Sequence, residues 1–364
     1  MTKEVMHDVL DSWTVDEENM LKESWNYLLQ LSGDDSKQEL NKGLWDFMAA
    51  DHPDVTIIRF LRAKRWDKKM AMAMLISTIQ WRKGQEINGI VQIGENVGLK
   101  SCPSADEKDF MMHHRSGKSY IRGIDRDGRP IYIIRARLHN PSSQSTRSME
   151  MFVLHTIENL RIMLKAPNDT SCFIFDLTGF GVRNIDLHII KFFIDVFESK
   201  YPGILGVVLI HNAPFIFWSI WKAIKAWLGP GIASKIHFTN SYNDLIRFIS
   251  PENLQTYYGG MDSWEYTYIE PVPRMDNRLQ PDDSAELNRE RSQLIHQFEA
   301  LTDEWIRLDP GSAATIEIAR QRYDLVKRLH QNYWKLDHYT RATTYYHRTG
   351  VIGVTGEVDF SAAK

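Results

Sequence analysis

Residues 206–240 read GVVLIHNAPFIFWSIWKAIKAWLGPGIASKIHFTN, and this stretch decides the fold. Its first five residues form a short β-branched run, which is typical of a buried strand, and the HNAP tetrapeptide at 211–214 ends that run. Apolar side chains then recur at helical spacing until Gly229-Pro-Gly231 stops them, and residues 234–239 read as a second strand. The stretch therefore predicts a crossover helix between two strands of an α/β sheet.

The predicted helix at 215–228 is apolar around most of its circumference. One apolar stripe along the helix consists of Ile216, Ile220, Ile224 and Trp227. The aromatic residues Phe217, Trp218 and Trp221 extend this apolar surface around the helix. Two interpretations fit: a helix buried deep in a large core, or a lid that faces a lipid cavity inward and a membrane outward. The residues that would form the lid and its membrane contact are Phe215, Phe217, Trp218, Trp221, Lys222, Lys225 and Trp227.

Composition places the chain among ordinary globular proteins. It has 364 residues, 43% of them hydrophobic, and a net charge of −3, which argues against nucleic acid as a main partner. Its two cysteines, Cys102 and Cys172, indicate neither a disulfide framework nor a zinc site, so we expect no metal and a reducing compartment.

Targeting signals are lacking at the start of the sequence. The opening residues MTKEVMHDVLDSW have no apolar run of the signal-peptide kind and are too acidic for a mitochondrial presequence, so we expect a cytoplasmic protein. Residues 203–221 are uncharged, but His211, Asn212 and Pro214 fall in their middle. Polar groups at that depth would be costly in a bilayer, so we expect no transmembrane span.

The periodicity of apolar residues changes along the chain. We expect a helical bundle over 1–98, an α/β domain over 99–275, a helical hairpin over 276–349 and a disordered tail over 350–364. In the α/β domain, strands at 120–124 and 130–134 flank an Asp-Gly turn, and helices are expected near 149–164 and 187–199 around a strand at 172–176. The fold class is α/β, with a mixed sheet backed by helices.

Several motifs resemble those of the CRAL-TRIO lipid-binding family, and of its yeast secretory phosphatidylinositol transfer protein branch in particular. They run in the family's order from about residue 40 to 270 and include IIRFLRAKRWD (57–67), DGRPIY (127–132), SCFIFDLTG (171–179), YPGILG (201–206), HNAPFIF (211–217), SKIHFT (234–239) and NLQTYYGG (253–260). The chain is most similar to fungal members with a long helical C-terminal extension.

The resemblance implies an N-terminal helical cap, an α/β domain whose sheet floors a lipid pocket, and a mobile helix that gates it. It further implies transfer of phosphatidylinositol and binding of another hydrophobic lipid. We expect a monomer without cofactor that contacts membranes peripherally and transiently. Residues 215–228 fall on the gate. A gated apolar cavity suits this task, because each CH₂ group exposed during transfer through water costs about 0.8 kcal/mol.

The family's phosphoinositide headgroup site is only partly retained. Arg59, Lys64 and Lys235 occupy positions whose basic residues bind the headgroup in the family. Phe192 replaces an acidic residue that hydrogen-bonds the inositol ring, and Ile232 replaces a threonine. The cations for phosphate recognition are thus present, whereas two hydroxyl-recognising groups are lost.

The family's phosphatidylcholine site is changed in the same way. Ser171 keeps the first of two hydroxyl residues that approach the choline-lipid phosphate, and Phe173 replaces the second. We expect Phe173, Phe175, Phe192 and Ile232 to line the pocket and to favour a neutral sterol or isoprenoid over phosphatidylcholine. Some members bind haem through His and Tyr here, but Ser171 and Phe173 offer no such ligands.

A search for catalytic motifs finds no GxGxxG after a strand and no GxxxxGK[ST], HExxH or GxSxG. The adjacent His113 and His114 read as part of an exposed loop rather than a chelating pair. Asp176 could be a catalytic acid or could equally cap the following turn by accepting N–H bonds, and the sequence offers no nucleophile and base to pair with it. These patterns favour a protein that is not an enzyme.

Two function classes stay open. The chain is either a lipid exchange protein or a lipid-sensing interaction module whose C-terminal hairpin, with its basic stretch from Arg320 to Arg348, recruits a partner. A carrier of a neutral isoprenoid or sterol is a variant of the first class.

Overall fold

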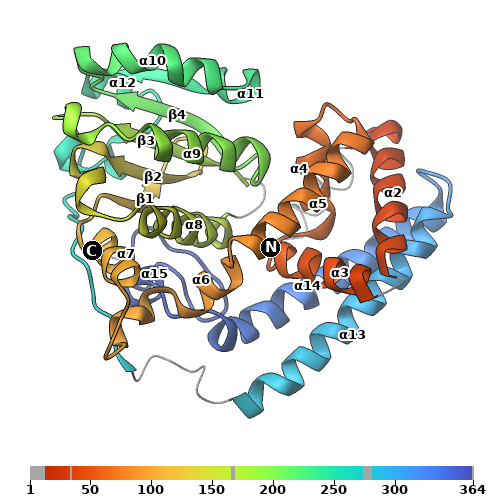
Figure 1. Ribbon diagram of the computed structural model, residues 1–364. Coiled ribbons are helices and arrows are strands. Elements are labelled where there is room, and N and C mark those ends of the chain that lie inside the picture. Colours follow the sequence, from red (N-terminus) through yellow and green to blue (C-terminus); the bar gives the residue numbers. More distant parts are fainter. Residues whose placement is uncertain (1–12, 33–34, 165–168, 274–280, 363–364) are drawn as a thin grey trace. The chain divides into compact units, whose positions relative to one another are not determined.

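The computed structural model describes residues 13–32, 35–164, 169–273 and 281–362. The chain divides into two compact units (Figure 1). One unit combines Met1–Asn88 with Asn277–Thr340, and the other combines Gly89–Asp276 with Arg341–Lys364. Each unit is therefore made from two separate stretches of chain, which differs from the four consecutive regions expected from the sequence.

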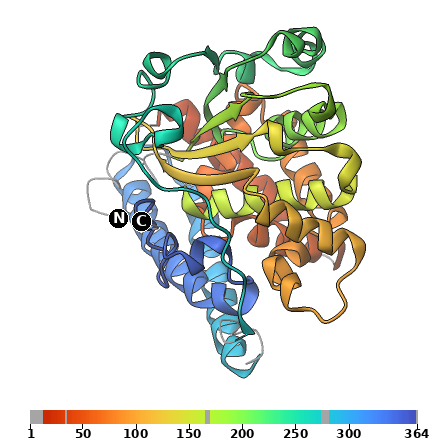
Figure 2. The same cartoon turned by 90° about the vertical axis from the view of Figure 1, so that its left-hand side faces the viewer.

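The first unit is helical. Its helices are α2 (Val15–Leu29), α3 (Asp35–Met48), α4 (Pro53–Ala63), α5 (Lys68–Gly84), α13 (Pro281–Ile306) and α14 (Ala313–Thr340), with a 3₁₀ turn at Gln30–Ser32. Thr14 caps α2 through a capping box with Glu17, and Asp67 caps α5. The long helices α13 and α14 run side by side (Figure 2), and α13 also packs on α2.

The apolar faces of α13 and α14 complete the core of this unit. Phe298 of α13 lies fully buried and contacts the Trp25 ring at 5.5 Å and the Trp45 ring at 5.8 Å, between ring centroids. The C-terminal hairpin therefore does not form a separate extension, because its apolar stripe is covered by the N-terminal helices.

The second unit is a mixed α/β layer structure. Its strands are β1 (Ser119–Ile124), β2 (Pro130–Arg135), β3 (Ser171–Asp176), β4 (Leu205–His211) and β5 (Ile236–Thr239). Its helices are α6 (Ile87–Ile93), α7 (Ala105–Arg115), α8 (Thr146–Met163), α9 (Leu187–Ser199), α10 (Phe215–Trp227), α11 (Pro230–Ala233), α12 (Tyr242–Leu245) and α15 (Tyr345–Arg348). Its 3₁₀ turns are Gly94–Leu99, Ala136–Leu138, Pro141–Ser143, Val182–Asn184, Pro251–Asn253 and Thr256–Tyr258.

The sheet has the order β1-β2-β3-β4-β5. β1 and β2 form the predicted antiparallel hairpin, and the Asp125 carboxylate closes its turn by accepting from the N–H groups of Asp127 and Arg129. β2 to β5 are parallel, so α10 is the predicted crossover between β4 and β5. The mixed α/β fold expected from the sequence is confirmed.

Side chains of the central strands alternate between the two faces of this sheet, apart from a register shift at the start of β3 and β4. One face packs on the segment after β5, with Ile131, Ile133, Cys172, Ile174, Val207 and Leu209 against Leu245, Ile249, Leu254 and Tyr258. The intervening residues of β2, β3 and β4 face α8, α9 and α10. The candidate site lies on this second face.

The C-terminal stretch 341–362 belongs to the second unit and is partly buried there. Tyr346 OH accepts a hydrogen bond from the Ile121 N–H at 2.9 Å, which satisfies a donor of edge strand β1. Val351 and Ile352 are buried, and Arg122 donates to the Phe360 carbonyl at 3.0 Å. The structure thus differs from the expected disordered tail over 350–362, because apolar residues in the tail find a binding surface. Residues 363–364 lie outside the described residues.

Candidate functional site

A cavity lies between the second face of the sheet and helices α8, α9 and α10. It contains about 1270 Å³ of empty space, its open mouth included. Most of its wall is hydrocarbon or aromatic. The apolar lining residues are Ile134, Ala136, Met149, Phe152, Val153, Phe175, Leu177, Phe180, Ile189, Ile190, Phe193, Ile194, Phe197, Leu205, Val208, Ile210, Phe217, Ile220, Trp221, Ile224, Leu228, Ile232 and Ile236.

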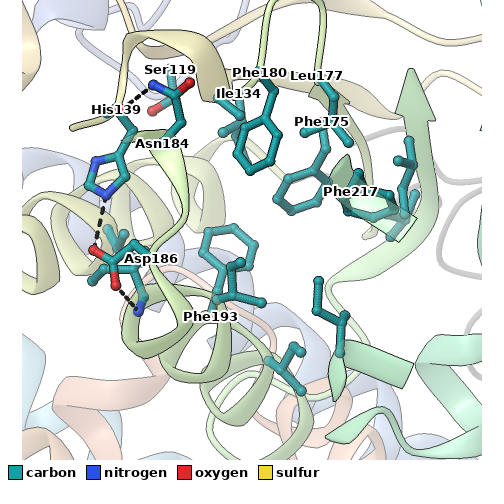
Figure 3. A pocket seen from close by; sticks show the side chains of 18 of the residues that line it. Ser119, Ile134, His139, Phe175, Leu177, Phe180, Asn184, Asp186, Phe193 and Phe217 are labelled. Atoms are coloured by element: carbon teal, nitrogen blue, oxygen red, sulfur yellow. Dashed lines mark hydrogen bonds and ion pairs between the residues drawn. The ribbon is translucent and has the colours of Figure 1, made fainter. Parts of the chain in front are cut away.

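Polar lining residues gather at one end of this cavity (Figure 3), and most of their polar atoms are bonded to the protein. His139 Nε2 lies 3.0 Å from Asp186 Oδ2, and Asn184 Nδ2 donates to the His139 carbonyl at 2.7 Å. Ser119 Oγ lies 2.9 Å from Tyr132 OH. A ligand would therefore meet mainly apolar surface, which suits hydrocarbon chains.

Helix α10 forms one wall of the cavity, and it also carries an outer aromatic face. Phe217, Trp221 and Ile224 line the cavity, whereas Phe215 is 92% exposed and Trp218 is 47% exposed. The outer face includes Phe238 of β5, whose ring centroid is 4.9 Å from that of Trp218. Both surfaces of the helix are thus apolar, which is unusual for a helix at a protein surface.

The remaining residues expected on the gate lie on its flanks. Lys222 and Lys225 are exposed, next to the outer aromatic face in sequence. Trp227 is half-buried, and Lys191 Nζ of α9 lies 6.0 Å from its ring centroid. Among the described residues, no helix is both long and apolar enough to cross a bilayer.

The four residues predicted to bind a headgroup lie in different places. Arg59 and Lys64 belong to the helical unit, where Arg59 pairs with Asp51 at 3.6 Å and Lys64 follows the last residue of α4. In the α/β unit, Ser171 Oγ donates to the Ile204 carbonyl at 3.0 Å. Lys235 Nζ donates to the Leu205 carbonyl, and burial lowers the pKa of Lys235. Neither Ser171 nor Lys235 is a lining residue of the cavity.

The structure separates the four residues predicted to line the pocket. Phe175 and Ile232 line the cavity, but Phe173 and Phe192 do not. Phe173 points to the same face as Phe175 but is fully buried under the Phe197 ring, 5.1 Å away, and the Tyr132 ring, also 5.1 Å away. Phe192 is half-buried on α9, one residue before the lining Phe193.

Most residues that line the cavity were not predicted from the sequence. Phe193 and Phe197 lie one turn apart on α9, and Tyr132 and Ile134 alternate along β2. Helical and strand periodicity place each of these residues on one apolar face. Such a pattern cannot distinguish a face that packs solidly from one that surrounds a cavity.

Asp176 has a structural role. Its carboxylate accepts from the Thr178 N–H at 2.9 Å and from Tyr258 OH at 3.1 Å, and it lies 3.5 Å from Arg137 Nη1. The interpretation of Asp176 as a turn cap is confirmed.

The interpretation of His113 and His114 as part of an exposed loop is wrong. Both lie on α7 and are buried, with His113 bonded to Ser148 Oγ at 3.1 Å and His114 packed edge-on against Phe110 at 4.7 Å between ring centroids. The prediction failed because most residues of α7 are polar, so its apolar face was not recognised from the sequence. Phe110 and Met111 also contribute to this face.

One buried group could be considered for a metal ion. Potential ligand atoms of Glu95, His114 and His155 lie within 4.8 Å of one another. However, Glu95 already pairs with Arg348 and accepts a hydrogen bond from Tyr268 OH at 2.7 Å. A divalent cation would have to compete with the Arg348 guanidinium for the carboxylate, so the group fits a structural network better than a metal site.

Comparisons with known proteins find relatives of this chain. The profile of the CRAL/TRIO domain matches residues 114–260, and that of the CRAL/TRIO N-terminal domain matches residues 16–77. A CRAL-TRIO domain-containing protein of Schizosaccharomyces pombe is 37% identical over 309 residues, or 85% of this chain and 68% of that protein. Phosphatidylinositol transfer protein CSR1 of Eremothecium gossypii is 35% identical over 338 residues, or 92% of this chain and 75% of that protein. The crystal structure of Sfh5 aligns at 16% identity with a TM-score of 0.46, covering 58% of this chain and 73% of that one.

Proposed function

The chain belongs to the CRAL-TRIO domain family, and on this premise we propose that it binds phosphatidylinositol and a second hydrophobic lipid in its gated cavity and exchanges them between membranes. The observation that carries the proposal is the α10 wall, with Trp221 and Ile224 on the cavity and Phe215 on solvent. A lipid carrier needs an apolar inner surface, because it must shield the lipid chains from water. It also needs an apolar outer surface that can contact a membrane, because the cavity must open there to release the lipid.

The outer face of α10 is suited to a membrane interface. Trp218 and Phe238 are exposed aromatic residues in contact, and Lys222 and Lys225 follow on the same helix. Indole rings partition to the headgroup region, and lysines near the surface are attracted to anionic lipids by about 1 kcal/mol each. Contact with the membrane would cover this exposed apolar surface and favour displacement of α10.

The cavity wall favours a second ligand with little polar surface. Ser119, His139 and Asn184 direct most of their hydrogen bonds to protein partners, and most of the remaining lining residues are apolar. The zwitterionic headgroup of phosphatidylcholine would lose hydrogen bonds to water here, at about 1–3 kcal/mol for each unsatisfied group. This supports an isoprenoid, sterol or other ligand with a small end group over phosphatidylcholine.

The alternative of an interaction module gains less support. Phe298 of α13 and Leu329 of α14 are buried within the helical unit, so the hairpin uses much of its apolar surface for its own fold. The proposed role of the hairpin is structural.

Two measurements test the proposed function. Lipids extracted from the purified full-length protein are identified by mass spectrometry, and transfer of labelled phosphatidylinositol between vesicles is followed with time. We expect phosphatidylinositol together with a more hydrophobic lipid, and transfer that depends on protein concentration. Phosphatidylcholine as the main bound lipid, or no transfer by folded protein, would contradict the proposal.

A further inference from the structure

A buried lysine lies at the polar end of the cavity. Lys118 directly precedes β1, is only 3% exposed and is one of the lining residues. Its Nζ donates one hydrogen bond, to Gln144 Oε1 at 2.8 Å. An ammonium group has three N–H donors, so two of them can reach another acceptor.

The charge of Lys118 is not neutralised by the described part of the protein. Among the described carboxylates none forms an ion pair with its Nζ, and burial is the cause that lowers its pKa to about 8. At pH 7 the amine is still mostly protonated. A buried cation without an anionic partner is costly, and such charges in proteins are normally paired.

The one carboxylate among the described lining residues, Asp186, is already hydrogen-bonded to other groups. Asp186 accepts from His139 and from the Ile189 N–H, and although burial opposes it, these bonds lower the pKa of Asp186. Arg135 also lines the cavity, but its guanidinium lies over the Tyr120 ring at 4.9 Å and donates to Tyr120 OH at 2.6 Å, on the opposite face of the sheet. Lys118 is therefore the described lining group at this end of the cavity that is short of an acceptor.

We propose that Lys118 binds the anionic end group of a ligand, a carboxylate or a phosphate, whose hydrocarbon chain extends along the aromatic wall formed by Phe175, Phe180 and Phe193 (Figure 3). This inference rests on the proposed function, because it assumes that the cavity holds lipid chains. It narrows the second lipid from any hydrophobic molecule to one with a single negatively charged end. The anion supplies the acceptors that the protein lacks.

The test compares two fluorescent probes that share one chain. cis-Parinaric acid carries a carboxylate, and its methyl ester carries none. Wild type, Lys118→Met, Lys118→Arg and the control Lys108→Met, which removes an exposed lysine of α7, are titrated with both probes at pH 7. Dodecyl phosphate and dodecanoate then compete with bound ester to distinguish a phosphate from a carboxylate end group.

We expect wild type and Lys108→Met to bind the acid about 10- to 100-fold more tightly than the ester. This is the gain in affinity that one charge-assisted hydrogen bond provides. Lys118→Met should lose this preference and keep the ester affinity, and Lys118→Arg should keep the preference in part. Equal affinity of wild type for both probes, or an unchanged preference in Lys118→Met, would overturn the inference and leave the proposed lipid cavity intact. If folded wild type binds neither probe and contains no extractable lipid, the proposed function itself fails.

Discussion

Asp54 Oδ1 of α4 lies 2.7 Å from Arg322 Nη2 of α14, so a buried ion pair joins residues 268 positions apart in the chain. Trp25 Nε1 donates to the same carboxylate oxygen at 2.6 Å. The Arg322 guanidinium also lies over the Trp305 ring at 4.3 Å and the Phe298 ring at 4.7 Å, to the ring centroids. The N-terminal helices and the C-terminal hairpin are thus held together by one polar network in their common core.

Arg322→Ala should destabilise the helical unit strongly. The substitution leaves the Asp54 carboxylate buried without its cation, which costs about 3–5 kcal/mol. Urea denaturation followed by circular dichroism measures the change. The control Arg320→Ala removes an exposed arginine that pairs with Glu317, and it should change stability by less than about 1 kcal/mol. Similar midpoints for the two variants would show that the pair does not stabilise the fold.

Truncation before residue 281 should likewise unfold the helical unit. Removal of α13 and α14 would expose Trp25 and Trp45, whose rings contact Phe298, and would leave Asp54 unpaired. A truncated chain therefore cannot separate a role in lipid transfer from a role in partner recruitment. The expected readout is loss of the cooperative melt. A truncated chain that melts like the full chain would instead support a hairpin with a separate recruiting role.

Two residues of α10 should separate membrane binding from lipid capacity. Trp218 lies on the outer face and Trp221 lines the cavity. Trp218→Glu should lower vesicle binding and transfer rate but leave the amount of bound lipid unchanged, because it alters only interfacial insertion. Trp221→Glu should lower bound lipid as well, because it places a carboxylate in the apolar wall.

Co-sedimentation with anionic vesicles and lipid extraction measure these two quantities. Ser219→Glu, a polar position on the same helix, serves as the control for added charge. Undiminished vesicle binding by Trp218→Glu would argue that α10 is not the membrane-facing surface.

The strands were predictable because strand side chains obey a short local rule. Alternation along β2, β3 and β4 and the Asp-Gly turn at 125–129 depend on neighbours within a few residues. The same holds for α9 and α10, whose ends lie at the residues where apolar spacing stops. The fold class could therefore be predicted from the sequence.

The cavity and the long-range contacts were not predictable in this way. Whether Phe173 lines a cavity or packs under Phe197 depends on a helix that follows β3 at a distance, and no local pattern records it. His114 is buried because α8 packs on it. The proposed role of Lys118 depends on tertiary structure as well, because the sequence does not show whether the fold brings a carboxylate to its ammonium group. These properties arise from tertiary packing.

Lys235→Ala should weaken phosphatidylinositol binding. Lys235 is a proposed headgroup residue whose Nζ donates to the Leu205 carbonyl, a single neutral acceptor. Loss of a charge-assisted contact to phosphate costs about 1.5–3 kcal/mol, or about 10- to 100-fold in affinity. Arg59→Ala should act in the same direction, although Arg59 also pairs with Asp51. The control is Lys200→Ala on the same unit, and equal transfer rates for all folded variants would remove both residues from the proposed site.

Acid should destabilise the α/β unit through its buried histidines. Burial lowers the pKa of His113 to about 2 and those of His114 and His155 to about 3, so all three are neutral in the folded state. In the unfolded chain they titrate near pH 6.5. The unfolded state therefore binds more protons below pH 6.5, and stability falls as the pH is lowered from there toward the folded-state pKa values. Each histidine contributes about 1.4 kcal/mol per pH unit once the pH is well below 6.5.

Urea unfolding at several pH values between 7.5 and 4.5 measures how the free energy of unfolding changes with pH. His113→Gln should reduce the slope by about 1.4 kcal/mol per pH unit, whereas His296→Gln, at an exposed position of α13, should not change it. A stability that stays constant from pH 6.5 to 4.5 would show that these histidines take up protons in the folded protein.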